Sequence, residues 1–301
     1  MNWVSIAILS VVAGTLVNII DSRLLSRQMP SLRAFLLLMG SVHFVYSWIF
    51  FFLFPLPRNL ETEPLLIAVG SGLLRTAAIT LLFYSLQKEE VARVIPVFYT
   101  YPIFVALIAM PILGESLSYS QWLSIIIVVA GAIIISVKRR PTGATIWLSR
   151  PFLLLFGSSL LMALMNITSK YALAYISPWS LFWLSTFCMS GIYLLISIRP
   201  RIIKQIGNMK RRNSTLALFI FNETLTALAT VLLFWALETG PASLVSAIVG
   251  GSRPVFVFIF ALILSRIWPT FLEWQPGRVA LILRIIAIAM IVSGLTIIYL
   301  T

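Results

Sequence analysis

The sequence has little charge, and this sets its class. Only 10% of its 301 residues are charged, whereas a soluble domain carries about 25% because its surface must face water. A chain with so few charges has to place most of its surface against an apolar medium. An ordinary soluble domain is therefore excluded.

Cysteine and histidine each occur once. The single cysteine, Cys188, excludes an internal disulfide, and no Cys/His spacing is typical of a metal site. One histidine and nine carboxylates leave little material for hydrolytic or redox chemistry, and no GxxxxGK[ST] nucleotide-binding loop is present. We therefore expect no enzyme, no metal and no cofactor. Any transport would be driven by a gradient or by exchange.

Apolar residues are abundant and occur in long runs. They make up 60% of the sequence, with a mean hydropathy of +1.02, and the runs reach the roughly 20 residues that cross a bilayer. Read between proline, glycine and charged breaks, they predict an all-α integral membrane protein of ten transmembrane helices. The predicted spans are 2–20, 31–54, 64–87, 90–112, 118–137, 150–174, 179–198, 214–237, 240–264 and 280–300. The first lacks a cleavage pattern, so we expect it to be retained.

The net charge of +13 lies in the short segments between these runs. The segments after the odd-numbered spans carry 17 Lys and Arg, and those on the opposite side carry only Arg58 and Lys170. Such a bias is typical of cytoplasmic loops, so both termini are expected outside. The same distribution argues against a nucleic-acid partner.

The two halves of the sequence resemble each other. AITLLFYSL (78–86) aligns with ATVLLFWAL (229–237), YPIFVALIA (101–109) with RPVFVFIFA (253–261), and VVAGAIII (128–135) with IVSGLTII (291–298). These matches pair Pro102 with Pro254 and Gly131 with Gly294. We therefore predict two five-helix repeats, 1–140 and 141–301, which together form one membrane domain.

Each repeat has an odd number of helices, so the second must enter the membrane inverted, and the position of the basic loops within each repeat flips accordingly. Inverted repeats recur in secondary transporters, where the two halves rock about a central site. A duplicated scaffold without transport activity is the alternative.

A family resemblance is carried by two corresponding segments, one in each repeat. They are FYSLQKEEVARVIPVFYTYPIFVALIAMPILGES (83–116) and FWALETGPASLVSAIVGGSRPVFVFIFALILSR (234–266). Each has an aromatic-small-Leu ending, a polar turn and a helix with a central proline. The chain resembles the EamA-like ten-helix carriers of the drug/metabolite transporter superfamily over nearly its whole length. It departs from the pattern at Arg266, which stands near the position of Glu115 in the first repeat.

The resemblance implies a small-molecule carrier in a cell membrane, as in the inner or plasma membrane of a prokaryote, and it favours export. It also implies cytoplasmic termini, against the charge bias. It places the fifth and tenth helices at the periphery, where a homodimer is expected to form. Ala130-Gly131 and Ser293-Gly294 supply small residues for close helix contact there.

Three charged residues lie well inside apolar spans, namely Arg75, Glu223 and Arg253, and His43 lies in the middle of a fourth span. A charge at the bilayer centre costs about 2.5–3.5 kcal/mol on insertion scales. One interpretation is a structural ion pair between Glu223 and an arginine. The other is that the surplus positive charge binds the carboxylate or phosphate of a solute, while Glu223 binds an ammonium group or a coupled proton. His43 is expected to be a hydrogen-bonded packing residue or a proton carrier.

Other residues are candidates for the wall of this site. Asn18 and Asn166 occupy paired positions, and Pro102 and Pro254 are predicted bending points. Aromatic side chains could form a wall for a planar solute, although interfacial belts explain them equally well: Tyr84, Tyr99, Tyr101, Trp183 and Trp235.

The sequence thus predicts a secondary carrier for a small anionic or zwitterionic metabolite, such as an amino acid, that works by alternating access and is surrounded by membrane lipids. A lipid or lipid-linked phosphate flippase and a non-transporting scaffold are the alternatives. An intramembrane enzyme would need a nucleophile–base pair or a metal constellation, and neither is visible.

Overall fold

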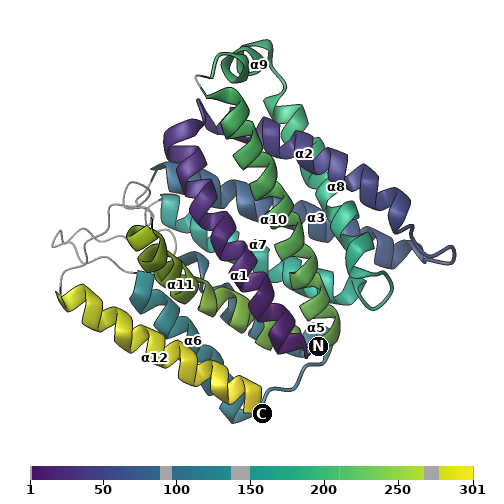
Figure 1. Cartoon of the computed structure of the whole chain (residues 1–301). Coiled ribbons are helices and arrows are strands. Elements are labelled where there is room, and N and C mark those ends of the chain that lie inside the picture. Colours follow the sequence, from purple (N-terminus) through teal and green to yellow (C-terminus); the bar gives the residue numbers. More distant parts are fainter. Residues whose placement is uncertain (1, 89–96, 137–149, 210, 268–277, 301) are drawn as a thin grey trace.

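Helices joined by short loops make up the described part of the chain (Figure 1). The computed structural model describes residues 2–88, 97–136, 150–209, 211–267 and 278–300. Within these ranges there is no strand. The helices are α1 Trp3–Arg23, the short π-helix η1 Leu24–Gln28, α2 Leu32–Leu53, α3 Thr62–Lys88, α5 Tyr101–Leu113, α6 Tyr119–Ser136, α7 Arg150–Ala172, α8 Pro178–Ser197, α9 Pro200–Gly207, α10 Arg212–Thr239, α11 Ala242–Ile267 and α12 Arg278–Leu300.

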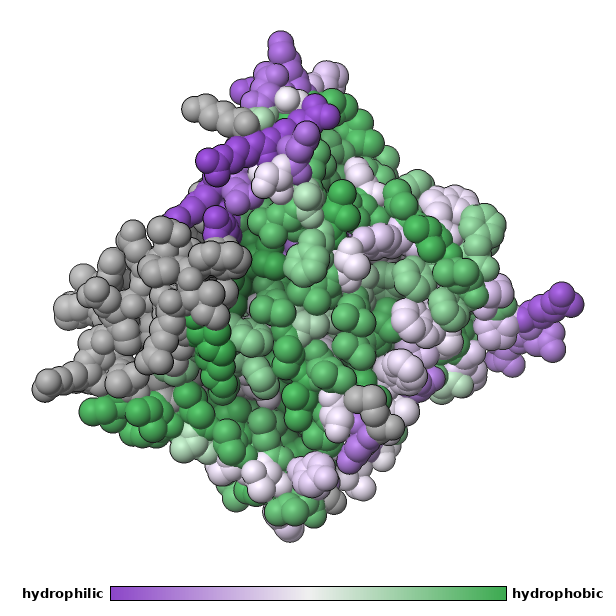
Figure 2. Space-filling view, viewed as in Figure 1, coloured by the Kyte–Doolittle hydropathy of each residue, from purple (hydrophilic) through white to green (hydrophobic). Residues whose placement is uncertain are grey.

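Seven of these helices have the length and apolar composition to cross a membrane: α1, α2, α3, α7, α8, α10 and α11. Three shorter apolar helical stretches accompany them: Tyr101–Leu113 (α5), Tyr119–Ile134 within α6 and Ile285–Leu300 within α12. Large apolar side chains such as Phe52, Leu195 and Leu300 are exposed over much of the surface. In Figure 2 the apolar side chains cover the middle of the face shown. A soluble monomer rarely exposes so much contiguous apolar surface. Because this surface accompanies seven helices able to cross a bilayer, the protein is a multi-pass membrane protein.

The apolar runs between proline, glycine and charged breaks predicted most helix starts closely, and a side-chain cap marks two of them. The side chain of Ser31 accepts a hydrogen bond from the backbone N–H of Ala34 and begins α2. Ser177 caps α8 in the same way, with Pro178 in the first turn. The short helix α9 was not predicted. The six basic residues within and around it were assigned to a loop instead. Residues 90–96 of the predicted span 90–112 lie outside the described residues.

The packing between the halves is reciprocal (Figure 1). Helix α1 packs on α10 and α11, and α7 packs on α3 and α5. Helix α2 packs on α8, α5 on α11, and α6 on α12. The core of the molecule therefore lies where helices from the two halves meet.

Glycines let α6 and α12 pack close together. The small residues at 130–131 and 293–294 had predicted close helix contact for these two segments. A Cβ added to Gly131 would lie 2.7 Å from Ile291 Cγ1, and one added to Gly294 would lie 2.5 Å from Val128 Cγ2. Neither position has room for a larger side chain. These glycine faces are used within the chain.

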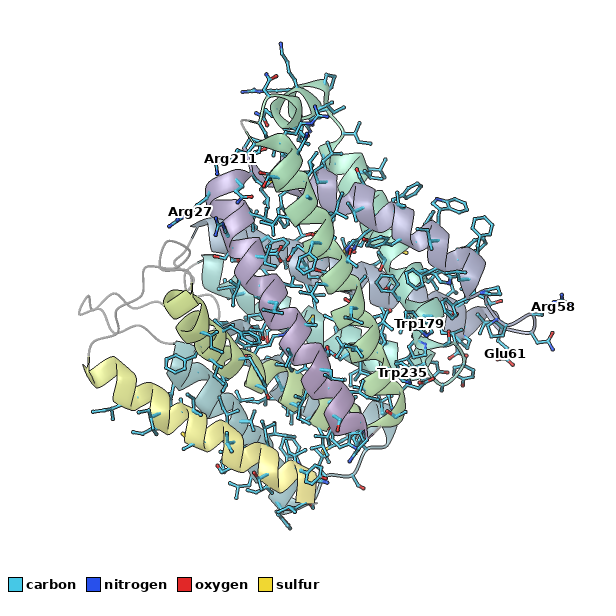
Figure 3. The ribbon with its side chains drawn as sticks, viewed as in Figure 1. Arg27, Arg58, Glu61, Trp179, Arg211 and Trp235 are labelled. Atoms are coloured by element: carbon cyan, nitrogen blue, oxygen red, sulfur yellow. The ribbon has the colours of Figure 1, made fainter. Side chains whose placement is uncertain are left out.

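The two ends of the bundle differ in charge. Both termini lie at one end, and α9 lies at the opposite end (Figure 1). Arg27 and Arg211 lie near α9, whereas Arg58 projects from the loop that follows α2 (Figure 3). We call the end with α9 the basic side and the end with both termini the termini side.

Candidate solute-binding site

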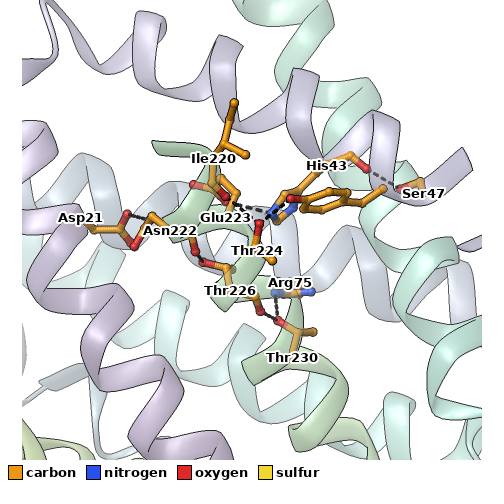
Figure 4. A network of polar contacts seen from close by, with 11 residues as sticks. Asp21, His43, Ser47, Arg75, Ile220, Asn222, Glu223, Thr224, Thr226 and Thr230 are labelled. Atoms are coloured by element: carbon orange, nitrogen blue, oxygen red, sulfur yellow. Dashed lines mark hydrogen bonds and ion pairs between the residues drawn. The ribbon is translucent and has the colours of Figure 1, made fainter. Parts of the chain in front are cut away.

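A carboxylate buried in α10 anchors the site. Glu223 is only 1% exposed, and its Oε2 lies 2.8 Å from Nε2 of His43 on α2, which is fully buried (Figure 4). The sequence offered an arginine as the structural partner of Glu223. The structure gives it His43 instead, because α2 and α10 bring these side chains face to face.

A second carboxylate joins the cluster from α1. The sequence placed Asp21 in the loop after span 2–20, but α1 continues to Arg23 and carries Asp21 into the bundle. Its Oδ1 accepts a 2.7 Å hydrogen bond from Nδ2 of Asn222, the residue before Glu223 (Figure 4). Asp21 and Glu223 are close enough to interact electrostatically. The available signal was that Asp21, the only aspartate in the sequence, directly follows an apolar run.

Arg75 enters the cluster from α3. It is 7% exposed, and its Nη2 donates a 2.8 Å hydrogen bond to Oγ1 of Thr230 on α10 (Figure 4). Thr230 in turn donates to the backbone carbonyl of Thr226. The guanidinium lies within electrostatic range of Glu223 and Arg253, yet none of the described carboxylates is paired with it. A hydroxyl, rather than an anion, therefore holds Arg75.

Arg253 forms the neighbouring part of the cluster on α11. The hydroxyl of Tyr99 lies close to the side chains of Arg253 and Asn18, and Tyr101 lies within electrostatic range of the same guanidinium. Gly14 of α1 makes room for it, since a Cβ there would lie 3.1 Å from Arg253 Nη2. A larger residue at position 14 would push the guanidinium aside.

Several polar atoms of this cluster are buried and make no hydrogen bond to another protein atom. In the described structure they include Arg75 Nη1, Arg253 Nε, His43 Nδ1 and Asn222 Oδ1. Buried polar groups in native proteins are almost always satisfied. Such a concentration of unsatisfied atoms is typical of a site that binds a polar ligand.

The remaining predicted residues lie elsewhere. Tyr84 and Trp235 are 46% and 43% exposed on the outside of the bundle. Trp183 donates its Nε1–H to the backbone carbonyl of Phe54 at the end of α2. Asn166 donates to the carbonyl of Met162 in its own helix, so it does not mirror the contact of Asn18.

The two predicted bending points differ in position. Pro102 is the second residue of α5 and packs close to Gly250, where an added Cβ would lie 2.9 Å from Pro102 Cγ. A bend there would separate α5 from the turn before it, rather than kink a helix in its middle. Pro254 lies inside α11.

Comparison with known proteins places this arrangement in a family. The sequence pattern of the EamA-like transporter family matches residues 1–137 and 149–293. The chain belongs to the EamA-like transporter family. This family is part of the drug/metabolite transporter superfamily. No curated protein sequence matches the chain.

One solved structure supports the fold of this EamA-like transporter. A protein of known crystal structure superposes with a TM-score of 0.73 at 15% identity, covering 98% of this chain and 95% of its own. At such low identity the likeness concerns the fold alone.

A second polar arrangement closes the termini side of the EamA-like bundle. Gly114 ends α5 in the left-handed conformation (φ 67°), which turns the chain so that Glu115 reaches the start of α11. The Glu115 carboxylate accepts hydrogen bonds from the backbone N–H of Ala242 (2.5 Å) and Ser243 (3.2 Å) and from the Ser243 hydroxyl (2.5 Å). An acidic group at a helix N-terminus is also favoured by the helix dipole.

Lys170 of α7 holds the other side of the same junction. Its Nζ donates to the backbone carbonyls of Glu238 (3.1 Å) and Gly240 (3.0 Å) at the end of α10. Glu115 and Lys170 therefore fix both helix ends that flank the α10–α11 turn.

Proposed function

We propose that this EamA-like transporter is a secondary carrier for a small zwitterionic solute of the amino-acid type. The observation that carries the proposal is the separation of charge within one buried cluster. Arg75 and Arg253 supply cations with unused donors, and Glu223 and Asp21 supply carboxylates nearby.

Asp21 changes the charge balance on which the proposal rests. With one carboxylate and two arginines, the interior would have surplus positive charge and would favour a simple anion. With Asp21 included, two arginines face two carboxylates. A solute that carries both signs fits this balance better, because neither of its charges is left unpaired in a medium of low dielectric constant.

Each pole suits one end of such a solute. An arginine fork can donate two parallel hydrogen bonds to a carboxylate. Glu223 and Asp21 can receive an ammonium group, and Asn222 Oδ1 is a further acceptor. Arg75 is buried among the helices, which favours a solute that enters the bundle over a lipid headgroup that stays at its edge.

We propose that ten spans form two inverted repeats and that their rocking carries the solute across. The reciprocal packing of α1 with α10 and α11, and of α7 with α3 and α5, supports this arrangement. So does the match of the family pattern to each half. The Glu115 contact would then be a gate, since it joins the first half to α11 of the second and must break when the termini side opens.

Uptake into proteoliposomes tests the proposal. The purified chain is reconstituted and offered radiolabelled amino acids, organic acids, organic cations and a fluorescent phospholipid. Arg253→Ala and Glu223→Gln are measured beside the wild type, with the exposed Arg58→Gln as the matched control.

Amino-acid uptake that falls at least tenfold in both site variants and persists in the control supports the proposal. Uptake of cations alone, scrambling of the phospholipid, or full activity in both site variants would each contradict it. Efflux from preloaded vesicles tests export, the direction that the family resemblance favours.

A further inference from the structure

The short helix α9 gives the basic side a surface that transport does not explain. Residues 197–215 contain six Lys and Arg and no acidic residue. The described cations of this segment are exposed, and Arg27 at the end of η1 is exposed beside them. Figure 2 shows hydrophilic side chains gathered over α9, and Figure 3 places Arg27 and Arg211 at this end. We call the following six residues the basic platform: Arg27, Arg199, Arg201, Lys204, Arg211 and Arg212.

The helix itself is amphipathic and is fixed to the bundle. Ile202 is buried against Ala34 and Leu37 of α2, and Ile206 packs on the same cluster. Ser31 donates a 3.2 Å hydrogen bond to Oε1 of Gln205. These contacts hold α9 against α2, so its charged face has a defined position.

The connections of α9 place it at the boundary of the bilayer. It follows α8, which ends at Ser197, and it precedes α10, which begins at Arg212. Both neighbours are candidate membrane spans. Ile198 and Ile203 are 57% and 55% exposed, so apolar side chains accompany the cations at this level. A short helix with an exposed isoleucine and outward cations, preceded by a second exposed isoleucine, is typical of a segment that lies in the interface plane.

We propose that the basic platform binds the headgroups of anionic phospholipids in the leaflet that the basic side faces. Clusters of four to eight cations next to a membrane span attract anionic lipid, with a strength that falls off over the Debye length. An acidic soluble protein would meet the same cations, but it would have to displace the lipid that exposed Ile198 and Ile203 contact. The position of the platform at the bilayer surface therefore favours lipid as its occupant.

Thermal unfolding of the purified full chain in neutral detergent tests the proposal. The unfolding midpoint is followed while phosphatidylglycerol or phosphatidylcholine is titrated in. The test variant is Arg201→Gln/Lys204→Gln/Arg211→Gln. The charge-keeping variant Arg201→Lys/Arg211→Lys and the termini-side variant Arg58→Gln are the controls.

Phosphatidylglycerol should raise the unfolding midpoint at a lower concentration than phosphatidylcholine, and 0.5 M salt should remove the difference. The half-saturating concentration of phosphatidylglycerol should rise about a hundredfold in the triple variant, at about fivefold for each cation removed near the surface. Both controls should titrate like the wild type.

Equal responses to the two lipids would overturn the proposal, and so would a triple variant that titrates like the wild type. A similar loss in Arg58→Gln would show general electrostatic attraction instead of a platform. If the triple variant does not fold, Lys204→Gln alone must weaken phosphatidylglycerol binding about fivefold for the proposal to stand. None of these outcomes depends on whether the protein transports amino acids.

Discussion

His43 Nε2 on α2 and Glu223 Oε2 on α10 lie 2.8 Å apart in the interior of the bundle, with less than 2% of either side chain exposed. The residues are 180 positions apart in the sequence and come from different halves. This pair ties the carboxylate pole of the proposed site to α2, a helix that carries neither Arg75 nor Arg253. Its loss should therefore affect both the packing of α2 on α10 and the binding of solute.

The pair can be tested with a double-mutant cycle. Glu223→Gln and His43→Gln should each lower the free energy of unfolding by about 1–3 kcal/mol, the cost of leaving a buried polar group without its partner. Their combined effect should fall short of the sum by about 1–3 kcal/mol because both remove the same contact. Thermal or denaturant unfolding of the four proteins measures this coupling, and strictly additive losses would show that the pair does not interact.

Thr230 should act as a positioning residue: it should fix the orientation of Arg75, and Arg75 should contact the solute. Thr230→Val keeps the side-chain shape but removes the acceptor of Arg75 Nη2, so a buried donor is left unsatisfied at a cost of about 1–3 kcal/mol. We expect a higher KM for the solute, since the guanidinium no longer has a fixed orientation. Thr239→Val is the control, because the Thr239 hydroxyl bonds only to its own helix and the residue is exposed. Equal effects of the two substitutions on KM would contradict the positioning role.

Gly14 should be required by Arg253. In Gly14→Ala the added methyl would stand 3.1 Å from Arg253 Nη2, so the guanidinium has to shift by a few tenths of an ångström. We expect uptake to fall several-fold while the protein remains folded, because alanine itself favours a helix. Gly157→Ala on α7 is the matched control, since no heavy atom lies within 4 Å of its added Cβ. Unchanged uptake in Gly14→Ala would show that the position of Arg253 does not matter for transport.

The Glu115 contact should control access from the termini side. Glu115→Gln removes the charge that caps α11, so the α10–α11 junction should open more often. In a Cys188→Ala background, Ser246→Cys places a reporter thiol at a buried position one turn into α11. Its alkylation by a membrane-impermeant maleimide should become several-fold faster with Glu115→Gln. The exposed Glu61→Gln should leave the rate unchanged, and equal rates in all three proteins would argue against a gate.

The sequence predicted the helices better than it predicted their partners. Apolar runs and the proline, glycine and charged residues that interrupt them are local signals, so the helix ends followed from them closely. Which side chains meet depends on how helices distant in sequence pack, and that is why the structural pair considered for Glu223 was with an arginine and not with His43.

Two features of the candidate site show the same limit. Asp21 was missed because one residue beyond an apolar run could equally belong to a loop or to the last turn of a helix. Tyr99 and Asn18 were expected at the site, and Tyr99 lies beside both Asn18 and Arg253. Trp235 and Tyr84 were also candidates, but apolar periodicity could not tell the inside of this bundle from its lipid-facing surface, because both are apolar.

Equilibrium binding of three related ligands tests the central claim most directly. The purified full chain is titrated with an α-amino acid, with the amine that lacks its carboxylate, and with the acid that lacks its ammonium group. If the arginines and the carboxylates each hold one end of the solute, the amino acid should bind at least tenfold more tightly than either analogue. In Arg253→Ala its advantage over the amine should largely disappear. An amine that binds as tightly as the amino acid in the wild type would contradict the account, because the arginines would then not recognise a carboxylate.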